Sequence, residues 1–174
     1  MKFKDIILKN NNDIAVELYT HIIPMMMTFS MKAITDRALP DIRDGFKPIV
    51  RKILYAMYNN GQLSNKPFVK SSNAVSETMK IHNHGDSSIY GAIALLTDKN
   101  ESCLHPYLEG DGQFGKSYNT DKPAQMRYTS VRLNKFTEDC ILKNINKGAV
   151  DFVTTSDHKQ PVFLPTMFCN ASKK

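Results

Sequence analysis

The spacing of apolar residues predicts helices through the first part of the chain. Residues 1–12 are polar and indicate a loose arm, and a helical pattern follows from about Asp13, a residue type suited to a helix N-cap. We expect Pro24 to interrupt this helix, because proline lacks the backbone N–H that a helix interior needs. A Met-rich segment, 25–38, continues at helical spacing, and we expect its methionines to fill a core.

Three more helices are predicted between residues 48 and 98. Pro48 suits a first helical turn, an apolar stripe follows it, and Asn60-Gly61 marks the end. Two short helices then begin near Ser71 and Asp86. Such a closely spaced pair is typical of a helix-turn-helix, although helical bundles also contain it.

The remainder of the chain is predicted to be mixed. Residues 99–127 are rich in turn formers and indicate a long extended or functional segment. We expect another helix from Thr129 or Ser130 to Gly148, and short strands at 149–155 and 161–168. The predicted fold class is therefore α+β and mostly helical, with an N-terminal arm and helix (1–24) and one larger domain (25–174).

The composition of this 174-residue chain limits its partners and its cellular compartment. It has 23 Lys and Arg against 17 Asp and Glu, a net charge of +6, which fits a polyanionic partner without proving one. Three widely spaced cysteines argue against both a disulfide framework and a zinc ribbon. With no secretory signal and no apolar run near the length of a membrane span, we expect a cytoplasmic protein.

The first candidate site is a basic segment between residues 43 and 52. Arg43, Lys47, Arg51 and Lys52 stand against a single acid, Asp44. Such a cluster can neutralise successive phosphates of a nucleic acid. The alternative is an ordinary solvated helix face.

The second candidate is His82-Asn83-His84-Gly85-Asp86. The H-x-H-x-D spacing is also found in zinc hydrolases, but the further histidine of that pattern is Ser87 here. Two imidazoles before a helix N-terminus could instead donate hydrogen bonds to phosphate. A plain hydrogen-bonded turn is the third interpretation.

Two more motifs are weak on their own. Gly110–Gly115 matches G-x-G-x-x-G, but its flanking residues do not predict the strand and helix of a dinucleotide site, so we expect a tight turn. Arg127-Tyr128 places a guanidinium beside a phenol. Arginine favours the phenolate form and can hold a phosphate under attack.

Taken in order, these segments resemble a known family. The motifs are Arg37–Pro48, Arg51–Met57, His84–Tyr90, the Gly110–Gly115 turn and Pro123–Thr129. This series is similar to the breakage-reunion region of type IIA DNA topoisomerases, that is, the A subunits of DNA gyrase and topoisomerase IV. The resemblance spans about residues 29–155 and implies a winged helix fold with residues 71–98 as its helix-turn-helix.

The resemblance also implies roles for individual residues. Tyr128 would attack a DNA phosphodiester and form a 5′-phosphotyrosine, Arg127 would hold the scissile phosphate, and Arg37 and His84 would assist catalysis. The residues implied to contact DNA are Arg43, Lys47, Arg51, Lys52, His82, Ser87 and Ser88. No residue of this chain is implied to bind metal, because Mg²⁺ and ATP would be held by a B-type partner subunit.

Further partners implied by the resemblance are duplex DNA and a second copy of the chain, which would dimerise through the winged helix region. The resemblance also implies that the protein is associated with the nucleoid. Asn83 stands where the family usually has proline, and Lys52 replaces a common arginine. The chain also stops before the family's second dimer gate, so we expect no strand passage by this chain alone. The alternative function is a non-catalytic module that binds DNA or interferes with a topoisomerase.

Overall fold

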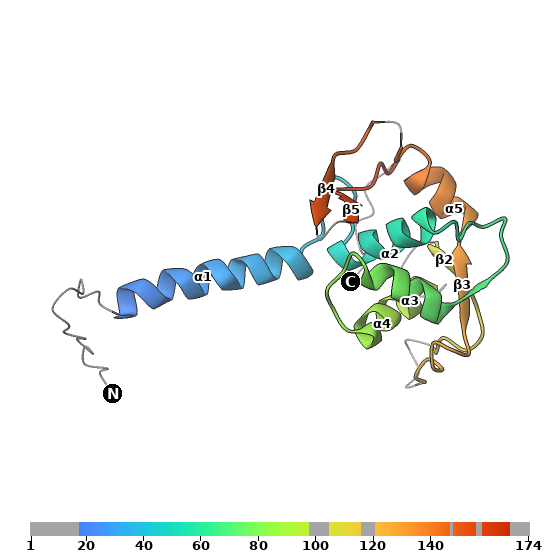
Figure 1. The fold of residues 1–174 in the computed structure, drawn as a ribbon, viewed down its shortest axis with the longest axis horizontal. Helices are drawn as coiled ribbons and strands as arrows, with labels where there is room; N and C mark the ends of the chain where they lie inside the picture. The colour runs from blue at the N-terminus through green and yellow to red at the C-terminus, as the bar shows by residue number, and fades with distance from the viewer. Residues whose placement is uncertain (1–17, 98–104, 116–120, 147, 156–157, 168–174) are drawn as a thin grey trace. The chain divides into compact units, whose positions relative to one another are not determined.

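The computed structural model describes residues 18–97, 105–115, 121–146, 148–155 and 158–167. The chain divides into two compact units, unit 1 (residues 1–39) and unit 2 (residues 40–174). Figure 1 shows the course of the chain in each. The predicted arm at 1–12 and the predicted cap at Asp13 lie outside the described residues.

Unit 1 is described by one helix, α1 (Leu18–Arg37). Pro24 lies inside this helix, so the predicted interruption is wrong, and the boundary expected at residue 24 falls within α1. A proline removes a single backbone donor, and the good helix formers that follow it continue the helix. The Thr28 hydroxyl donates to the carbonyl oxygen of Pro24 at 2.8 Å.

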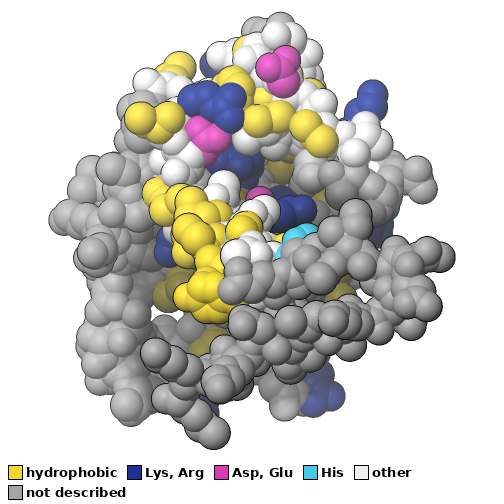
Figure 2. All heavy atoms as spheres, turned by 90° about the vertical axis from the view of Figure 1, so that its left-hand side faces the viewer, with side chains coloured by type: hydrophobic (Ala, Val, Ile, Leu, Met, Phe, Trp, Pro, Cys, Tyr) yellow, Lys and Arg dark blue, Asp and Glu magenta, His cyan; other side chains and the backbone are white. Residues whose placement is uncertain are grey.

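The apolar residues of α1 do not form a core. Met26 and Phe29 are 58% and 71% exposed, and the space-filling view shows hydrophobic side chains, in yellow, open at the surface (Figure 2). The core role predicted for the Met-rich segment is therefore wrong for the single chain. Apolar residues lie all around α1, so they mark no single buried stripe.

Unit 2 begins with three helices that match the predictions. They are α2 (Pro48–Asn59), α3 (Ser71–Met79) and α4 (Asp86–Thr97). Pro48 occupies the first turn of α2, and Gly61, with φ of +70°, follows its end. Contacts join α3 with α4, the pair predicted as the helix-turn-helix, and α2 packs against both.

A three-stranded antiparallel sheet packs with these helices. Its strands are β1 (Val69–Lys70), β2 (Leu108–Asp111) and β3 (Ser130–Leu133), in the order β1-β3-β2. The helix predicted from residue 130 is wrong over β3. Val131 and Leu133 are buried while Ser130 and Arg132 are half-buried, which is the period-two pattern of a strand.

Helical structure resumes only after β3. The Asn134 side chain accepts a hydrogen bond from the N–H of Phe136 at 3.0 Å and caps α5 (Lys135–Thr137). A π-helical turn, η1 (Glu138–Leu142), continues it.

The last element is a hairpin of β4 (Phe152–Thr155) and β5 (His158–Pro161). The first predicted strand, 149–155, contains β4. The second, 161–168, is wrong, because it shares only Pro161 with β5 and residues 162–167 form no strand. The register pairs Phe152 with Pro161 and Thr155 with His158. An antiparallel partner so close in sequence begins soon after β4 ends, and the apolar pattern alone did not reveal that.

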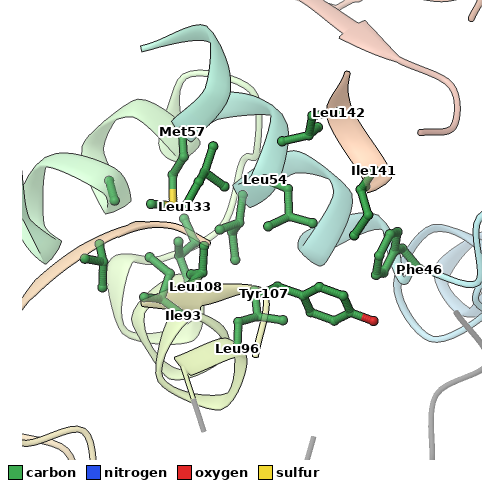
Figure 3. Packing of buried hydrophobic residues seen from close by; sticks show 14 of the residues in the cluster. Phe46, Leu54, Met57, Ile93, Leu96, Tyr107, Leu108, Leu133, Ile141 and Leu142 are labelled. Atoms are coloured by element: carbon green, nitrogen blue, oxygen red, sulfur yellow. The ribbon is translucent and has the colours of Figure 1, made fainter. Parts of the chain in front are cut away.

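The core of unit 2 lies where α2, α4, β2 and β3 meet. Figure 3 shows Leu54, Met57, Ile93, Leu108 and Leu133 converging there, and each is at most 1% exposed. Phe46 and Tyr107 extend this core with an edge-to-face contact, their ring centroids 5.2 Å apart. Helices packed on a small antiparallel sheet confirm the predicted α+β winged helix class. No helix in the described ranges is long and apolar enough to cross a membrane.

Candidate active site and nucleic-acid interface

Tyr128 and Arg127 lie at the end of the connection between β2 and β3, immediately before Thr129 and β3. We call the described part of this connection, residues 112–115 and 121–129, the wing connection. The Tyr128 side chain is 67% exposed, and Arg127 is exposed beside it. A nucleophile for a polymer as bulky as duplex DNA must be open in this way.

Arg127 has a neutral partner. Its Nε donates to Oε1 of Gln125 at 2.7 Å, and its terminal nitrogen donates to the same oxygen. The guanidinium carbon lies 5.3 Å from the centroid of the Tyr128 ring, within cation–π range. Because an amide carries no net charge, the positive charge of Arg127 is not neutralised by this contact and can attract an anion.

Two backbone hydrogen bonds hold the segment that carries Tyr128. The N–H of Tyr128 donates to the carbonyl oxygen of Gln125 at 2.8 Å, closing a turn. Thr129, which is fully buried, accepts from the N–H of Ser71 through its carbonyl oxygen at 3.0 Å. The residue that follows the exposed tyrosine is thus hydrogen-bonded to the N-terminus of α3.

The glycine-rich turn lies against the same segment. A Cβ built on Gly112 would come within 3.3 Å of the backbone of Tyr128 and Thr129, and φ of Gly112 is +109°. A strand, β2, does run into the first glycine, contrary to expectation, but residues 112–115 and 121–124 form no helix. The turn therefore serves close packing, as predicted.

The basic segment divides into inward and outward residues. Arg51 is 11% exposed and forms a two-pronged ion pair with Asp44, with Nε to Oδ2 at 2.7 Å and the terminal nitrogen to Oδ1 at 3.0 Å. Asp44 is fully buried and also accepts from the N–H groups of Phe46 and Leu164. This geometry does not support the DNA contact expected of Arg51, because its Nε and one terminal nitrogen are engaged inside the fold.

Arg43 makes a similar pair at the surface. Its guanidinium donates to both carboxylate oxygens of Asp41, at 3.0 and 2.8 Å, and lies 4.3 Å from the ring centroid of Phe163. The hydrogen bond from Arg43 is the main cause that lowers the pKa of Asp41 to about 2. Lys47 is exposed just before α2, and Lys52 is half-buried on it.

The two histidines stand together in the turn between α3 and α4. Their ring centroids are 4.5 Å apart, and the N–H of His84 donates to the carbonyl oxygen of His82 at 2.9 Å. His82 is only 9% exposed, whereas His84 is exposed. At the start of α4, Ser87 and Ser88 are exposed, which agrees with an interface there.

Arg37, the remaining predicted catalytic residue, is the last residue of α1 in unit 1 and is exposed. Within the described ranges, no group of three His, Cys, Asp or Glu side chains could hold a metal ion. The zinc interpretation of the His82–Asp86 motif thus finds no ligand set among these residues.

Comparison with known proteins decides the family. The family model for the A subunit of DNA gyrase/topoisomerase IV matches residues 37–171. The chain belongs to this family. It is 39% identical over 160 residues to the chloroplastic/mitochondrial DNA gyrase A subunit of Nicotiana benthamiana, and 42% identical over 147 residues to the DNA gyrase A subunit of Staphylococcus epidermidis.

The similarity covers most of this chain and a small part of those proteins. The two alignments span 90% and 83% of the chain, but only 17% and 16% of the respective relatives. A third relative, the DNA gyrase A subunit of Borreliella burgdorferi, is 42% identical over 82% of the chain and 18% of its own length. The activity of the complete gyrase A proteins is thus a matter of proposal for this chain.

The sequence did not reveal the residues that support this A-subunit site. Gln125, Ser71 and Tyr90 hold Arg127, Thr129 and the wing connection. Gln125 and Tyr90 stand in motifs that carry the resemblance, but the sequence assigned no role to any of the three. Asp44 had a usable signal, since a lone acid in a basic segment indicates an internal ion pair.

Proposed function

We propose that this chain is the DNA-cleaving winged helix part of a type IIA topoisomerase A subunit, with Tyr128 as nucleophile. The observation that carries the proposal is the exposed Tyr128 beside Arg127, on a segment hydrogen-bonded to the helix-turn-helix. The family membership supports it independently.

The proposed reaction is a transesterification. The phenol oxygen of Tyr128 forms a bond to phosphorus, the bond from phosphorus to the 3′ oxygen breaks, and the released 3′ oxygen gains a proton as the phenol loses one. The number of phosphate ester bonds stays the same, so the strand can be resealed by the reverse step. Arg127 would hold the non-bridging oxygens and stabilise their charge in the transition state.

The outward groups supply the proposed DNA interface. Lys47, His84, Ser87 and Ser88 are exposed, and the side chain of Arg43 is 47% exposed, so these residues can contact phosphates. Arg37 would add a phosphate contact from unit 1. Lys52 is half-buried and His82 is buried, so each would contact only a phosphate that lies directly against the protein surface.

Mg²⁺ and ATP belong to the proposal only through a partner. The described residues do not fit a complete metal site, so no step above involves the ion. We propose that a B-type subunit binds both, and that a second copy of this chain joins through the winged helix region to cut the opposite strand.

The test combines the full chain with a gyrase B-type subunit, Mg²⁺ and duplex DNA, and measures protein attached covalently to 5′ ends. We expect an adduct with the native chain and with Tyr19→Phe, which alters another exposed tyrosine (71% exposed, on α1), but none with Tyr128→Phe. An equal adduct with Tyr128→Phe would refute the assignment of the nucleophile. Salt-dependent DNA binding with no adduct at all would support the non-catalytic alternative instead.

A further inference from the structure

A chain of buried hydroxyl groups lies behind the proposed nucleophile. The Tyr90 hydroxyl, from α4, donates to the carbonyl oxygen of Ala124 at 2.5 Å and lies 3.0 Å from Oγ1 of Thr129. Oγ1 of Thr129 is in turn 2.8 Å from Oγ of Ser71, the first residue of α3. Tyr90 is 8% exposed, and Thr129 and Ser71 are fully buried.

The two contacts of Tyr90 bracket the reactive pair. Ala124 precedes Arg127 and Tyr128 in the chain, and Thr129 follows them. The Tyr90 hydroxyl therefore contacts both ends of segment 124–129: its single proton goes to the carbonyl oxygen of Ala124, and its oxygen lies where it can accept from Oγ1 of Thr129. The hydrogen bond from the Tyr128 N–H to the carbonyl oxygen of Gln125 closes the turn between them. The ends of this segment cannot separate without breaking a buried hydrogen bond, which is costly.

We propose that Tyr90, acting through Ala124 and Thr129, is a positioning residue that fixes Tyr128 for attack on the DNA phosphate. This inference rests on the proposed function, because it assigns a role in the same cleavage step. Tyr90 does not touch the reacting atoms. Displacing a nucleophile by about 1 Å can slow a reaction about 100-fold, so a single clamp at this place has a large kinetic effect.

A merely structural role predicts a different pattern, and Thr129 separates the two. Thr129→Val keeps the side-chain volume and loses the hydroxyl, whereas Thr129→Ser keeps the hydroxyl and loses a buried methyl group. If the Thr129 hydroxyl positions Tyr128, Thr129→Val slows cleavage and Thr129→Ser does not. If Thr129 only fills space, Thr129→Ser slows cleavage and Thr129→Val does not.

Tyr90→Phe has a matched control in Thr137→Val. Thr137 is also fully buried, and its hydroxyl donates to the carbonyl oxygen of Tyr107 at 2.7 Å, on a segment outside the wing connection. Both variants lose one buried hydroxyl group, which has two contacts in Tyr90 and one in Thr137. Only Tyr90→Phe loosens the segment that carries Tyr128.

The experiment measures single-turnover formation of the 5′ adduct by the full chain with a B-type subunit, Mg²⁺ and duplex DNA, alongside DNA affinity and melting temperature. We expect Tyr90→Phe and Thr129→Val to cleave about 10- to 100-fold more slowly with DNA affinity unchanged. Thr129→Ser should retain most of the rate, and Thr137→Val all of it. The double variant Tyr90→Phe/Thr129→Val should be no slower than the worse single variant, because both break one clamp.

Two results would overturn the inference while leaving the proposed function intact. One is a native rate in Tyr90→Phe, and the other is a Thr129→Ser chain slower than Thr129→Val. Equal slowing by Thr137→Val would also overturn it, since that would trace the effect to general stability. If the native chain forms no adduct, the proposed function fails and the positioning role fails with it.

Discussion

Arg51 and Arg127 are both arginines of the predicted DNA-binding region, and the structure places them in opposite environments. Arg51 is 11% exposed and pairs with the fully buried carboxylate of Asp44. Arg127 is exposed and contacts the neutral amide of Gln125. The first guanidinium is neutralised inside the protein, while the second keeps its charge at the surface.

The difference shows what decides whether an arginine can bind phosphate. Both residues carry the same charge within the predicted interface, but their partners differ. If a guanidinium that pairs with a buried carboxylate moves away, the negative charge of the carboxylate is left unpaired in the interior, which is costly. Four predictions test this contrast, from the largest expected effect to the smallest.

The largest effect is expected for Arg51→Ala. Removing one member of a buried ion pair costs about 3–5 kcal/mol, so the free energy of unfolding in urea should fall by that amount. In an Asp44→Asn background the same change should cost much less, because no carboxylate is left unpaired. A loss below about 1 kcal/mol in the native background would show that the pair is not structural.

Arg127→Ala should show the reverse profile. We expect adduct formation to slow by about 100- to 1,000-fold, as when one transition-state donor is removed. The free energy of unfolding should stay within about 0.5 kcal/mol of the native value, because Arg127 is exposed. Arg127→Lys should be intermediate in rate, since lysine keeps the charge and lacks the planar fork. Unfolding caused by Arg127→Ala would end the contrast with Arg51.

Lys47→Ala tests an outward charge of the same basic segment. Lys47 is exposed before α2, and loss of one phosphate contact should reduce the slope of log affinity against log salt by about 0.9. Lys135→Ala, an exposed lysine on α5 outside the predicted interface, should leave the slope unchanged. Equal slopes for the native chain and Lys47→Ala would remove Lys47 from the interface.

The smallest effect concerns the surface pair of Asp41 and Arg43. The pKa of Asp41 is about 2 in the folded chain against an ordinary value of 3.8, so ionised Asp41 stabilises the fold above pH 3.8. That contribution disappears as the pH falls through about 2. With Arg43 47% exposed and Asp41 22%, solvent screening limits it to about 1 kcal/mol at most. Asp41→Asn should flatten the stability profile between about pH 4 and pH 2; an unchanged slope would contradict the assignment.

The fold was predictable where apolar spacing had one interpretation. The stripe of α2 and the starts of α3 and α4 follow from Pro48, Ser71 and Asp86. Residues 130–133 were mistaken for a helix because so short a segment cannot distinguish the helical repeat of apolar positions from the strand repeat. The core role predicted for the methionines of α1 was wrong for another reason. Apolar character indicates that a surface can be covered, but it does not indicate what covers it.

The candidate site was predictable only at the level of motifs. Arg127-Tyr128 and His84 stand exposed, as a DNA-facing role requires. The inward turn of Arg51 and the clamp of Tyr90 depend on partners 7 and 39 residues away in the chain. The lone acid Asp44 in the basic segment is the one sequence signal of the first pairing, whereas the second arises from tertiary packing and no motif records it.

The hydrogen bond from the N–H of Leu164 to the Asp44 carboxylate spans 120 residues at 2.9 Å. During synthesis, Asp44 emerges from the ribosome long before Leu164 exists. Until then its carboxylate can be served by Arg51 and Phe46 but not by its last partner. The hydrogen-bond set around this buried carboxylate can therefore be completed only after residue 164 has been synthesised, so this part of unit 2 cannot reach its final form while the preceding residues alone have emerged.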